Sequence, residues 1–245
     1  MSADWITPDW PAAQRVHAVS TTRSGGVSAG VYDSLNLGQH VGDDMIAVTE
    51  NRRRLVTALK LQAEPRWMQQ VHGMRVAKLA GKPVDAPADA AATDLPAECC
   101  VVMTADCLPV LFCDRAGTRV AAAHAGWRGL ASGVLEATVK AMGVPQSEIL
   151  AWMGPAIGPK AYEVGDEVRQ EFAGRDSKAA VAFSPGLAQG KWWCDLYALA
   201  RQRLETAGIR QIYGGGFCTY TEKERFFSFR RDGQCGRMAT LIWLA

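Results

Sequence analysis

The sequence predicts an α+β fold, built as a single domain over residues 1–245. The chain length suits one large domain or two small ones, and 48% apolar with 21% charged residues is typical of a soluble globular protein. Short apolar or β-branched stretches outnumber the helical patterns, and several follow one another without a helix between them. No internal repeat, low-complexity tract or block of like charge divides the chain. Consecutive strands of this kind favour α+β over a doubly wound parallel sheet.

The individual elements follow from local patterns. Strands are predicted where short runs are apolar or β-branched: Val16–Thr22, Arg66–Val71, Val76–Leu79, Cys99–Thr104, Leu108–Cys113, Arg119–His124 and Ile149–Met153. Helices are predicted at Asp44–Leu61, Leu130–Met142, Asp166–Phe172 and Asp195–Ala207. The second and fourth helices stop before Gly143 and Gly208, the residue type common just past a helix end. Two stretches are expected to be long loops, namely Gly81–Pro96 and Gly174–Gly190.

Composition excludes several classes of protein. The chain has 27 Lys plus Arg against 25 Asp plus Glu, and this near-balance argues against nucleic acid and membrane surfaces as partners. No apolar run approaches the roughly 18–20 residues of a membrane span, and the first residues lack a secretory pattern. Seven cysteines, an odd number, favour free thiols in a reducing compartment, so we expect a cytoplasmic protein.

The most informative segment is TADCLPVLFCDRAGTRVAAAHAGWRG, residues 104–129, in which a turn-forming tetrapeptide separates two apolar strands. In a simple hairpin register Cys113 faces Thr118, and continuing that pairing places Cys107 opposite His124. Facing residues have Cβ atoms about 4.5–5.5 Å apart. A thiol and an imidazole at that spacing form either a pair of metal ligands or a nucleophile with its base. The alternative is a small buried cysteine beside a core histidine.

A catalytic zinc ion usually has three protein ligands, and His72 is the best third candidate. It ends a predicted strand and precedes Gly73, which allows close approach of backbone or substrate. His17 alternates within a predicted strand, and His40 has no partner by spacing. Two imidazoles with a thiolate favour Zn²⁺, although the same donors also suit Cu²⁺.

Three arginines are candidates for binding an anionic group such as phosphate. Arg23 precedes a Gly-Gly turn, and Arg128 lies at a helix start next to glycines, where free backbone N–H groups also attract anions. Arg52 belongs to a basic helical stretch whose simpler explanation is a solvated face. Asp106 neighbours Cys107 and is a candidate proton acceptor, with turn capping as its alternative. The signatures of phosphate-loop proteins, serine hydrolases and zinc nucleoside deaminases are absent from the sequence.

At these segments the sequence resembles the YfiH-type proteins, the laccase-domain or multicopper polyphenol oxidase family. The matching segments run in order along almost the whole chain: STTRSGGVSAGVYDSLNLGQHVGD, ENRRRL, QQVHG, TADCLPVLFCD, AAHAGWRGL, GPAIGPKAYEVG and CTYTEKERFFSFRRDGQCGRMATLIWL. The resemblance implies a sandwich-like core of mixed sheets with helices outside, similar to a bacterial toxin deamidase domain. It also implies a zinc ion bound by His72, Cys107 and His124.

The resemblance further implies a purine nucleoside enzyme that uses phosphate to cleave adenosine, inosine and methylthioadenosine and that also deaminates adenosine. The same family suggests an alternative, a Cys–His amidohydrolase acting on a peptidoglycan precursor, with Cys107 as nucleophile and His124 as base. In a third interpretation the zinc is purely structural, with Cys113 or Cys218 as a fourth ligand. Polyphenol oxidation is the weakest alternative, because four histidines without any His-x-His pair are too few for several copper ions.

Overall fold

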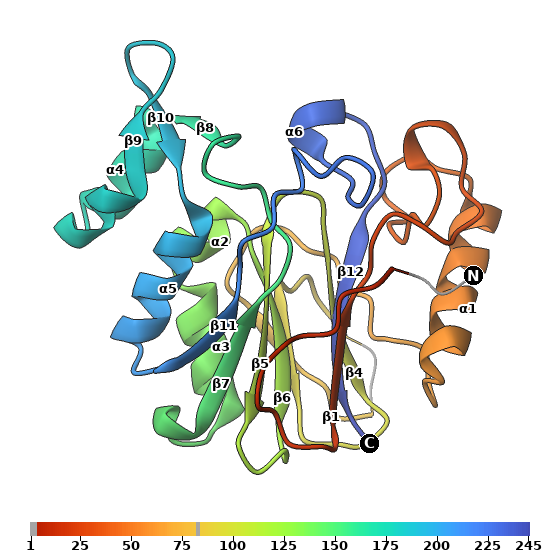
Figure 1. The fold of residues 1–245 in the computed structure, drawn as a ribbon. Helices are drawn as coiled ribbons and strands as arrows, with labels where there is room; N and C mark the ends of the chain where they lie inside the picture. Colours follow the sequence, from red (N-terminus) through yellow and green to blue (C-terminus); the bar gives the residue numbers. More distant parts are fainter. Residues whose placement is uncertain (1–3, 82–83) are drawn as a thin grey trace.

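A computed structural model describes residues 4–81 and 84–245 and contains three β-sheets (Figure 1). The largest is mixed and has the strand order β11-β7-β5-β6-β3-β2. Its inner pairs are antiparallel, while the edge strands β2 and β11 run parallel to their neighbours. The strands of this sheet are β2 (Val76–Lys78), β3 (Ala90–Thr93), β5 (Leu108–Asp114), β6 (Val120–Ala125), β7 (Ile149–Met153) and β11 (Gln211–Gly214).

The two other sheets are three-stranded and antiparallel. One has the order β1-β12-β4 and packs against a face of the six-stranded sheet, so the two form a sandwich. Its strands are β1 (Val16–Ser20), β4 (Cys99–Thr104) and β12 (Met238–Leu244). The other has the order β8-β10-β9 and projects with α4 at one side of the molecule (Figure 1). Its strands are β8 (Glu163–Gly165), β9 (Phe183–Pro185) and β10 (Lys191–Cys194).

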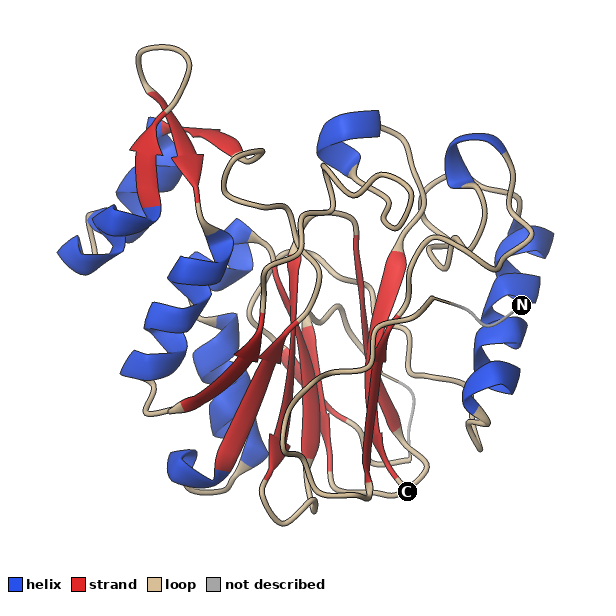
Figure 2. Cartoon of the chain, in the orientation of Figure 1, coloured by secondary structure: helices blue, strands red, loops and turns tan. Residues whose placement is uncertain are grey.

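Helices cover both outer sides of the sandwich (Figure 2). The α-helices are α1 (Met45–Leu59), α2 (Trp127–Ser132), α3 (Val134–Met142), α4 (Asp166–Ala173), α5 (Leu196–Thr206) and α6 (Phe229–Asp232). Three short 3₁₀ helices are η1 (Gly30–Tyr32), η2 (Gln146–Glu148) and η3 (Ser177–Ala182). Helix α1 packs through Leu55 on the β1-β12-β4 sheet, while α2, α3 and α5 cover the six-stranded sheet. The predicted α+β class, with a sandwich-like core and outer helices, is confirmed.

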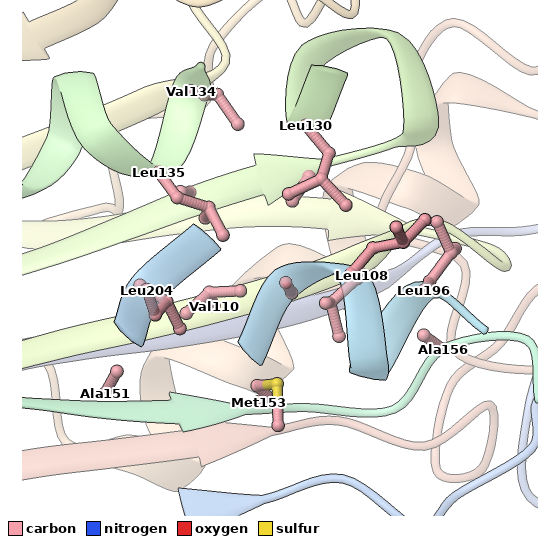
Figure 3. Close-up of a cluster of buried hydrophobic side chains, with 14 of the residues drawn as sticks. Leu108, Val110, Leu130, Val134, Leu135, Ala151, Met153, Ala156, Leu196 and Leu204 are labelled. Carbon is pink, nitrogen blue, oxygen red and sulfur yellow. The ribbon is translucent and has the colours of Figure 1, made fainter. Parts of the chain in front are cut away.

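Packing on both faces explains why the central strands are apolar throughout. In β5, Val110 and Phe112 face the helices, while Leu111 and Cys113 face the other sheet, and all four are fully buried. Such doubly covered strands lack the alternation of half-exposed strands. The core on the helix side combines side chains of β5, β7, α2, α3 and α5 (Figure 3). None of the helices in the described part of the chain has the length and apolarity needed to cross a membrane.

The structure corrects several predicted elements. The predicted strand Arg66–Val71 is wrong, because these residues form neither a strand nor a helix. The predicted helix Leu130–Met142 is two helices, because the chain turns at Gly133, whose φ of 102° is left-handed. The expected loop Gly81–Pro96 contains β3, an alanine-rich strand that local propensity does not reveal because alanine is a weak strand former. Residues 82–83 of that stretch lie outside the described residues.

Further strands were missing from the sequence prediction. The expected loop Gly174–Gly190 contains η3 and β9. Strands β8, β10, β11 and β12 were not predicted either, although β12 lies between β1 and β4 at the centre of its sheet. Strands β4 and β7, by contrast, have the predicted bounds. The two helix ends predicted before glycine are confirmed to within one residue, since α3 ends at Met142 and α5 at Thr206. Both glycines are left-handed, with φ values of 63° at Gly143 and 91° at Gly208.

Candidate metal centre and active site

His72, Cys107 and His124 lie together where β6 ends and α2 begins. One ligand atom from each residue lies within 4.8 Å of the others, the only such group of three or more His, Cys, Asp or Glu among the described residues. The Sγ of Cys107 is 3.7 Å from Nε2 of His72, and the two imidazole rings meet edge to face with centroids 4.7 Å apart. His124 is buried in β6, Cys107 directly precedes β5, and His72 lies in the loop before β2.

The hairpin register differs from the simple one predicted. Cys113 pairs with Val120, and His124 pairs with Pro109, so the expected direct pairing of Cys107 with His124 is wrong. Asp114 causes the shift, since its carboxylate accepts hydrogen bonds from the backbone N–H groups of Thr118 and Arg119 and closes a longer turn. Cys107 precedes Leu108, the first paired residue of β5, so the register of the pairs does not fix its position. Its thiol lies within 4.8 Å of a ring nitrogen of His124.

Asp89 organises the cluster, and the sequence analysis did not predict this role. Its fully buried carboxylate accepts from Nδ1 of His124 at 2.8 Å. It also accepts from the backbone N–H groups of Val71, His72 and Gly73 at 3.1, 2.8 and 2.8 Å. A carboxylate only accepts, so Nδ1 of His124 carries the hydrogen and Nε2 is directed to the cluster. The only local signal was an acidic residue directly before four small residues, in a stretch predicted to be a loop.

The electrostatics of the cluster favour a thiolate. Burial raises the pKa of the Cys107 thiol, but the adjacent His124 and His72 imidazoles lower it more, and the net shift is downward. For His124, burial lowers the pKa of the imidazole. The charge of Cys107 and the hydrogen bond to Asp89 raise that pKa by more, so the net shift is upward. For Asp89, burial raises the pKa, and the hydrogen bonds from His124 and the backbone lower it on balance. These three groups therefore stabilise one another's charged forms, and a thiolate is the form of cysteine that binds metals.

Backbone geometry brings the ligands close. His72 has a φ of 61°, a left-handed conformation uncommon for a non-glycine residue, and the three hydrogen bonds to Asp89 hold that turn. Gly126 lies against the ligands, since a Cβ there would be 2.8 Å from Cδ2 of His72 and 2.9 Å from Sγ of Cys107. At Gly129 a Cβ would be 2.9 Å from the carbonyl oxygen of Gly73. Both glycines let the start of α2 approach the cluster.

These residues fit a zinc ion. Ligand atoms of tetrahedral zinc lie about 3.5 Å apart, because Zn–N and Zn–S bonds are roughly 2.0 and 2.3 Å long. The 3.7 Å separation between Cys107 and His72 agrees with that value. A histidine that binds a metal through one ring nitrogen usually donates a hydrogen bond from the other nitrogen to a carboxylate or carbonyl oxygen. In His124, Nδ1 donates to Asp89 in this way. Two imidazoles and one thiolate leave a fourth position for water or substrate.

Asp106 is bonded at both carboxylate oxygens. Its Oδ1 accepts from the Thr219 hydroxyl at 2.6 Å, and its Oδ2 accepts from the backbone N–H of Arg230 at 2.7 Å. The side chain is buried, and the residue has a φ of 96°. Asp106 therefore ties the turn that carries Cys107 to the segment that contains α6.

The three arginines predicted from sequence lie in different surroundings. Arg128 is exposed on α2 next to the cluster, with its guanidinium 4.5 Å from the Trp127 ring centroid. Arg23 donates to the carbonyl oxygens of Asp33 and Lys223 and lines a cavity of about 420 Å³ that none of the three cluster residues lines. Arg52 is buried in α1, donates to the carbonyl oxygen of Leu37 and lies 4.0 Å from the Trp67 ring centroid.

The other metal-ligand candidates stay apart from the cluster. His17 stacks on Trp243 with ring centroids 5.6 Å apart, and His40 is not part of the group. Cys113 is buried between the two sheets, and Cys218 accepts from the backbone N–H of Gly158. Neither cysteine supplies a fourth ligand to the group formed by the described residues.

Comparisons with known proteins agree with this architecture. Residues 17–245 match the family model described as multi-copper polyphenol oxidoreductase laccase. The chain is 57% identical over 241 residues to the purine nucleoside phosphorylase YfiH of Escherichia coli strain K12, covering 98% of both proteins. It is 56% identical over 240 residues to a purine nucleoside phosphorylase of Pseudomonas aeruginosa, again covering 98% of both.

Solved structures show the same fold. The crystal structure of a Neisseria meningitidis protein, 51% identical, superimposes with a TM-score of 0.93 and covers 98% of this chain and 99% of that one. The crystal structure of YlmD from Geobacillus stearothermophilus, 34% identical, has a TM-score of 0.89 and covers 96% and 93%. The resemblance seen in the motifs is confirmed, and the chain belongs to the YfiH family of laccase-like domain proteins.

Proposed function

We propose that this protein is a zinc-dependent purine nucleoside phosphorylase and that the chain acts as one catalytic domain. The observation that carries the proposal is the His72–Cys107–His124 cluster, oriented by Asp89 and closely approached by the backbone of Gly126. Relatives that match nearly the whole chain are named purine nucleoside phosphorylases, which supports the reaction class. When bound, zinc would supply a Lewis acid at this position. Copper would compete for the same donors.

The proposed substrates are adenosine, inosine and methylthioadenosine, together with phosphate. In phosphorolysis a phosphate oxygen forms a bond to the ribose anomeric carbon while the bond from that carbon to the purine nitrogen breaks. The site must therefore bind an anion beside the nucleoside, and Arg128 is favoured because it lies next to the cluster. Arg23 stays a second candidate. The internal contacts of Arg52 account for it as a structural residue.

We also propose adenosine deamination as a second activity of the same site. In this reaction water adds at C6 of the purine and ammonia leaves. The residues of the chain would position the base and hold charge: Asp89 keeps the imidazole of His124 oriented, and Cys107 stays a thiolate. Asp106 has both oxygens occupied, which favours a positioning role over that of proton acceptor.

One observation favours a second candidate, a Cys–His amidohydrolase acting on a peptidoglycan precursor. Cys107 supplies a thiol, His124 an imidazole next to it, and Asp89 a carboxylate that orients the imidazole. Nucleophilic cysteine enzymes use this arrangement. Metal ligation would block this chemistry, since the same sulfur cannot be a zinc ligand and a free nucleophile. Oxidation of polyphenols by several copper ions has no such support, because only two of the four histidines join the cluster.

Metal analysis combined with product identification tests the proposal. Purified protein should contain one zinc per chain and should convert adenosine plus phosphate to adenine and ribose 1-phosphate, with inosine as the product of deamination. Chelation should abolish both activities, and added zinc should restore them. Full activity in the metal-free protein would reject the zinc proposal and favour the amidohydrolase.

A further inference from the structure

Arg230 lies beside the cluster although 123 residues separate it from Cys107 in the chain. Its backbone N–H donates to Oδ2 of Asp106 at 2.7 Å, and Asp106 directly precedes Cys107. This bond fixes the start of α6 over the turn that carries the thiol. Because the bond uses the backbone of Arg230, it leaves the side chain free for another role.

The guanidinium of Arg230 is fixed but has no acidic partner. Its Nη1 donates to the carbonyl oxygen of Glu163 at 2.7 Å, and its Cζ lies 5.1 Å from the Tyr162 ring centroid. Nε and Nη2 donate to nothing in the described residues, and no carboxylate there lies within 4.0 Å of the guanidinium. The Glu163 carboxylate is directed elsewhere and accepts from the backbone N–H of Leu187.

The neighbouring Arg231 shows the contrast within one helix. Its Nε and Nη2 pair with the two carboxylate oxygens of Asp232, and its Nη1 donates to the carbonyl oxygens of Thr219 and Tyr220. All three nitrogens of Arg231 are therefore committed to the fold. Arg230 is exposed, is held at one nitrogen, and keeps the Nε–Nη2 edge open.

We propose that Arg230 binds the phosphate co-substrate through its Nε–Nη2 edge. This inference rests on the proposed function and names a residue that the motif analysis did not single out as a ligand. The open edge of a guanidinium presents two parallel N–H groups, the geometry that matches two oxygens of a phosphate. The bond to Glu163 and the stacking on Tyr162 hold this edge in place before the anion arrives, which lowers the entropic cost of binding.

Two neighbours of Arg230, Asp106 and Tyr162, bear on the binding of an anion there. Asp106 is the acidic residue bonded to its backbone, and both oxygens of that carboxylate already accept hydrogen bonds. The Tyr162 hydroxyl makes no hydrogen bond to the described residues, and burial raises the pKa of the phenol, so it stays protonated and able to donate. A phosphate bound to this edge would lie beside Tyr162 and the start of β8, which the guanidinium contacts.

The test compares Arg230→Gln and Arg230→Lys with Arg53→Gln, which removes the same charge from an exposed arginine on α1. Initial rates are measured with phosphate varied at saturating adenosine and with adenosine varied at saturating phosphate. Binding of inorganic phosphate to each zinc-loaded protein is measured by calorimetry. Losing a charge-assisted hydrogen bond should raise the phosphate KM of Arg230→Gln roughly 10- to 100-fold, with a smaller rise for Arg230→Lys.

The adenosine KM, the zinc content and the melting temperature should match those of the wild type in both Arg230 variants. Arg53→Gln should match the wild type in every measurement. An unchanged phosphate KM and unchanged phosphate binding in both Arg230 variants would overturn the inference while leaving phosphorolysis intact. If the wild type shows no phosphate-dependent cleavage, the proposed function fails, and calorimetry with phosphate alone then decides whether Arg230 binds the anion.

Discussion

The carboxylate of Asp89 accepts a hydrogen bond from Nδ1 of His124 at 2.8 Å, and the same oxygen accepts from the backbone N–H of His72. One buried side chain thus orients one imidazole of the cluster and fixes the backbone of the other. The two histidines come from different parts of the fold, a strand and a loop. The Asp89 carboxylate sets their relative position because it bonds to both residues.

Asp89→Asn should weaken zinc binding about 10- to 100-fold, the range typical for loss of a carboxylate behind a ligating histidine. The amide keeps the shape of the side chain but removes the charge and one acceptor. Competition with a chromogenic chelator measures the affinity. Asp85→Asn is the matched control, since Asp85 is exposed and its ion-pair partner among the described residues is Arg75, and it should bind zinc as the wild type does. Equal affinity in both variants would show that Asp89 does not support the metal.

Cys107→Ala should abolish stoichiometric zinc, because two neutral imidazoles without a thiolate bind the ion weakly. Elemental analysis of the purified variant measures the loss. Cys218→Ala is the control, as Cys218 is the other partly exposed cysteine among the described residues and lies outside the cluster. Zinc retained in Cys107→Ala at one ion per chain would exclude the proposed ligand set.

Alkylation should distinguish a metal-bound thiolate from a free nucleophile. In a Cys218→Ala background, Cys107 should resist iodoacetamide in the zinc-loaded protein and react after chelation. The histidines lower the pKa of the free thiol, so the rate in the metal-free protein should rise with pH through a midpoint below the ordinary value of about 8.5. Mass spectrometry of the modified protein follows the reaction. Rapid alkylation with zinc present, together with loss of activity, would favour the amidohydrolase.

Asp106→Asn should destabilise the protein by about 1–3 kcal/mol, because the amide N–H₂ cannot accept from the Thr219 hydroxyl and the Arg230 backbone as both carboxylate oxygens do. Thr219→Val removes one of these bonds without changing Asp106 and should lower stability in the same direction. Denaturant unfolding measures both. If Asp106→Asn keeps wild-type stability yet loses activity with a changed pH profile, Asp106 acts as a proton acceptor instead of a positioning residue.

Local patterns predicted much of the fold. The buried runs at 99–104 and 149–153 became β4 and β7 with the predicted bounds. Asp44 and Asp195, placed at the starts of two predicted helices, cap them by accepting from the backbone N–H groups of Ile46 and Ala198. Strands with both faces covered are apolar at every position, and helix caps involve residues a few positions apart, so a single stretch of sequence contains the signal.

Tertiary structure decided the rest of the site. Asp89 is 35 residues from His124, and Asp106 is 124 residues from Arg230, so no periodicity or local spacing links either pair. Even the hairpin between β5 and β6 took a different register from the simplest one, because the side chain of Asp114 closes a longer turn. The residue types of the cluster could be predicted from the sequence, but the Asp89 carboxylate behind His124 and the contact between Asp106 and Arg230 depend on sheet pairing and hydrogen bonds between distant segments.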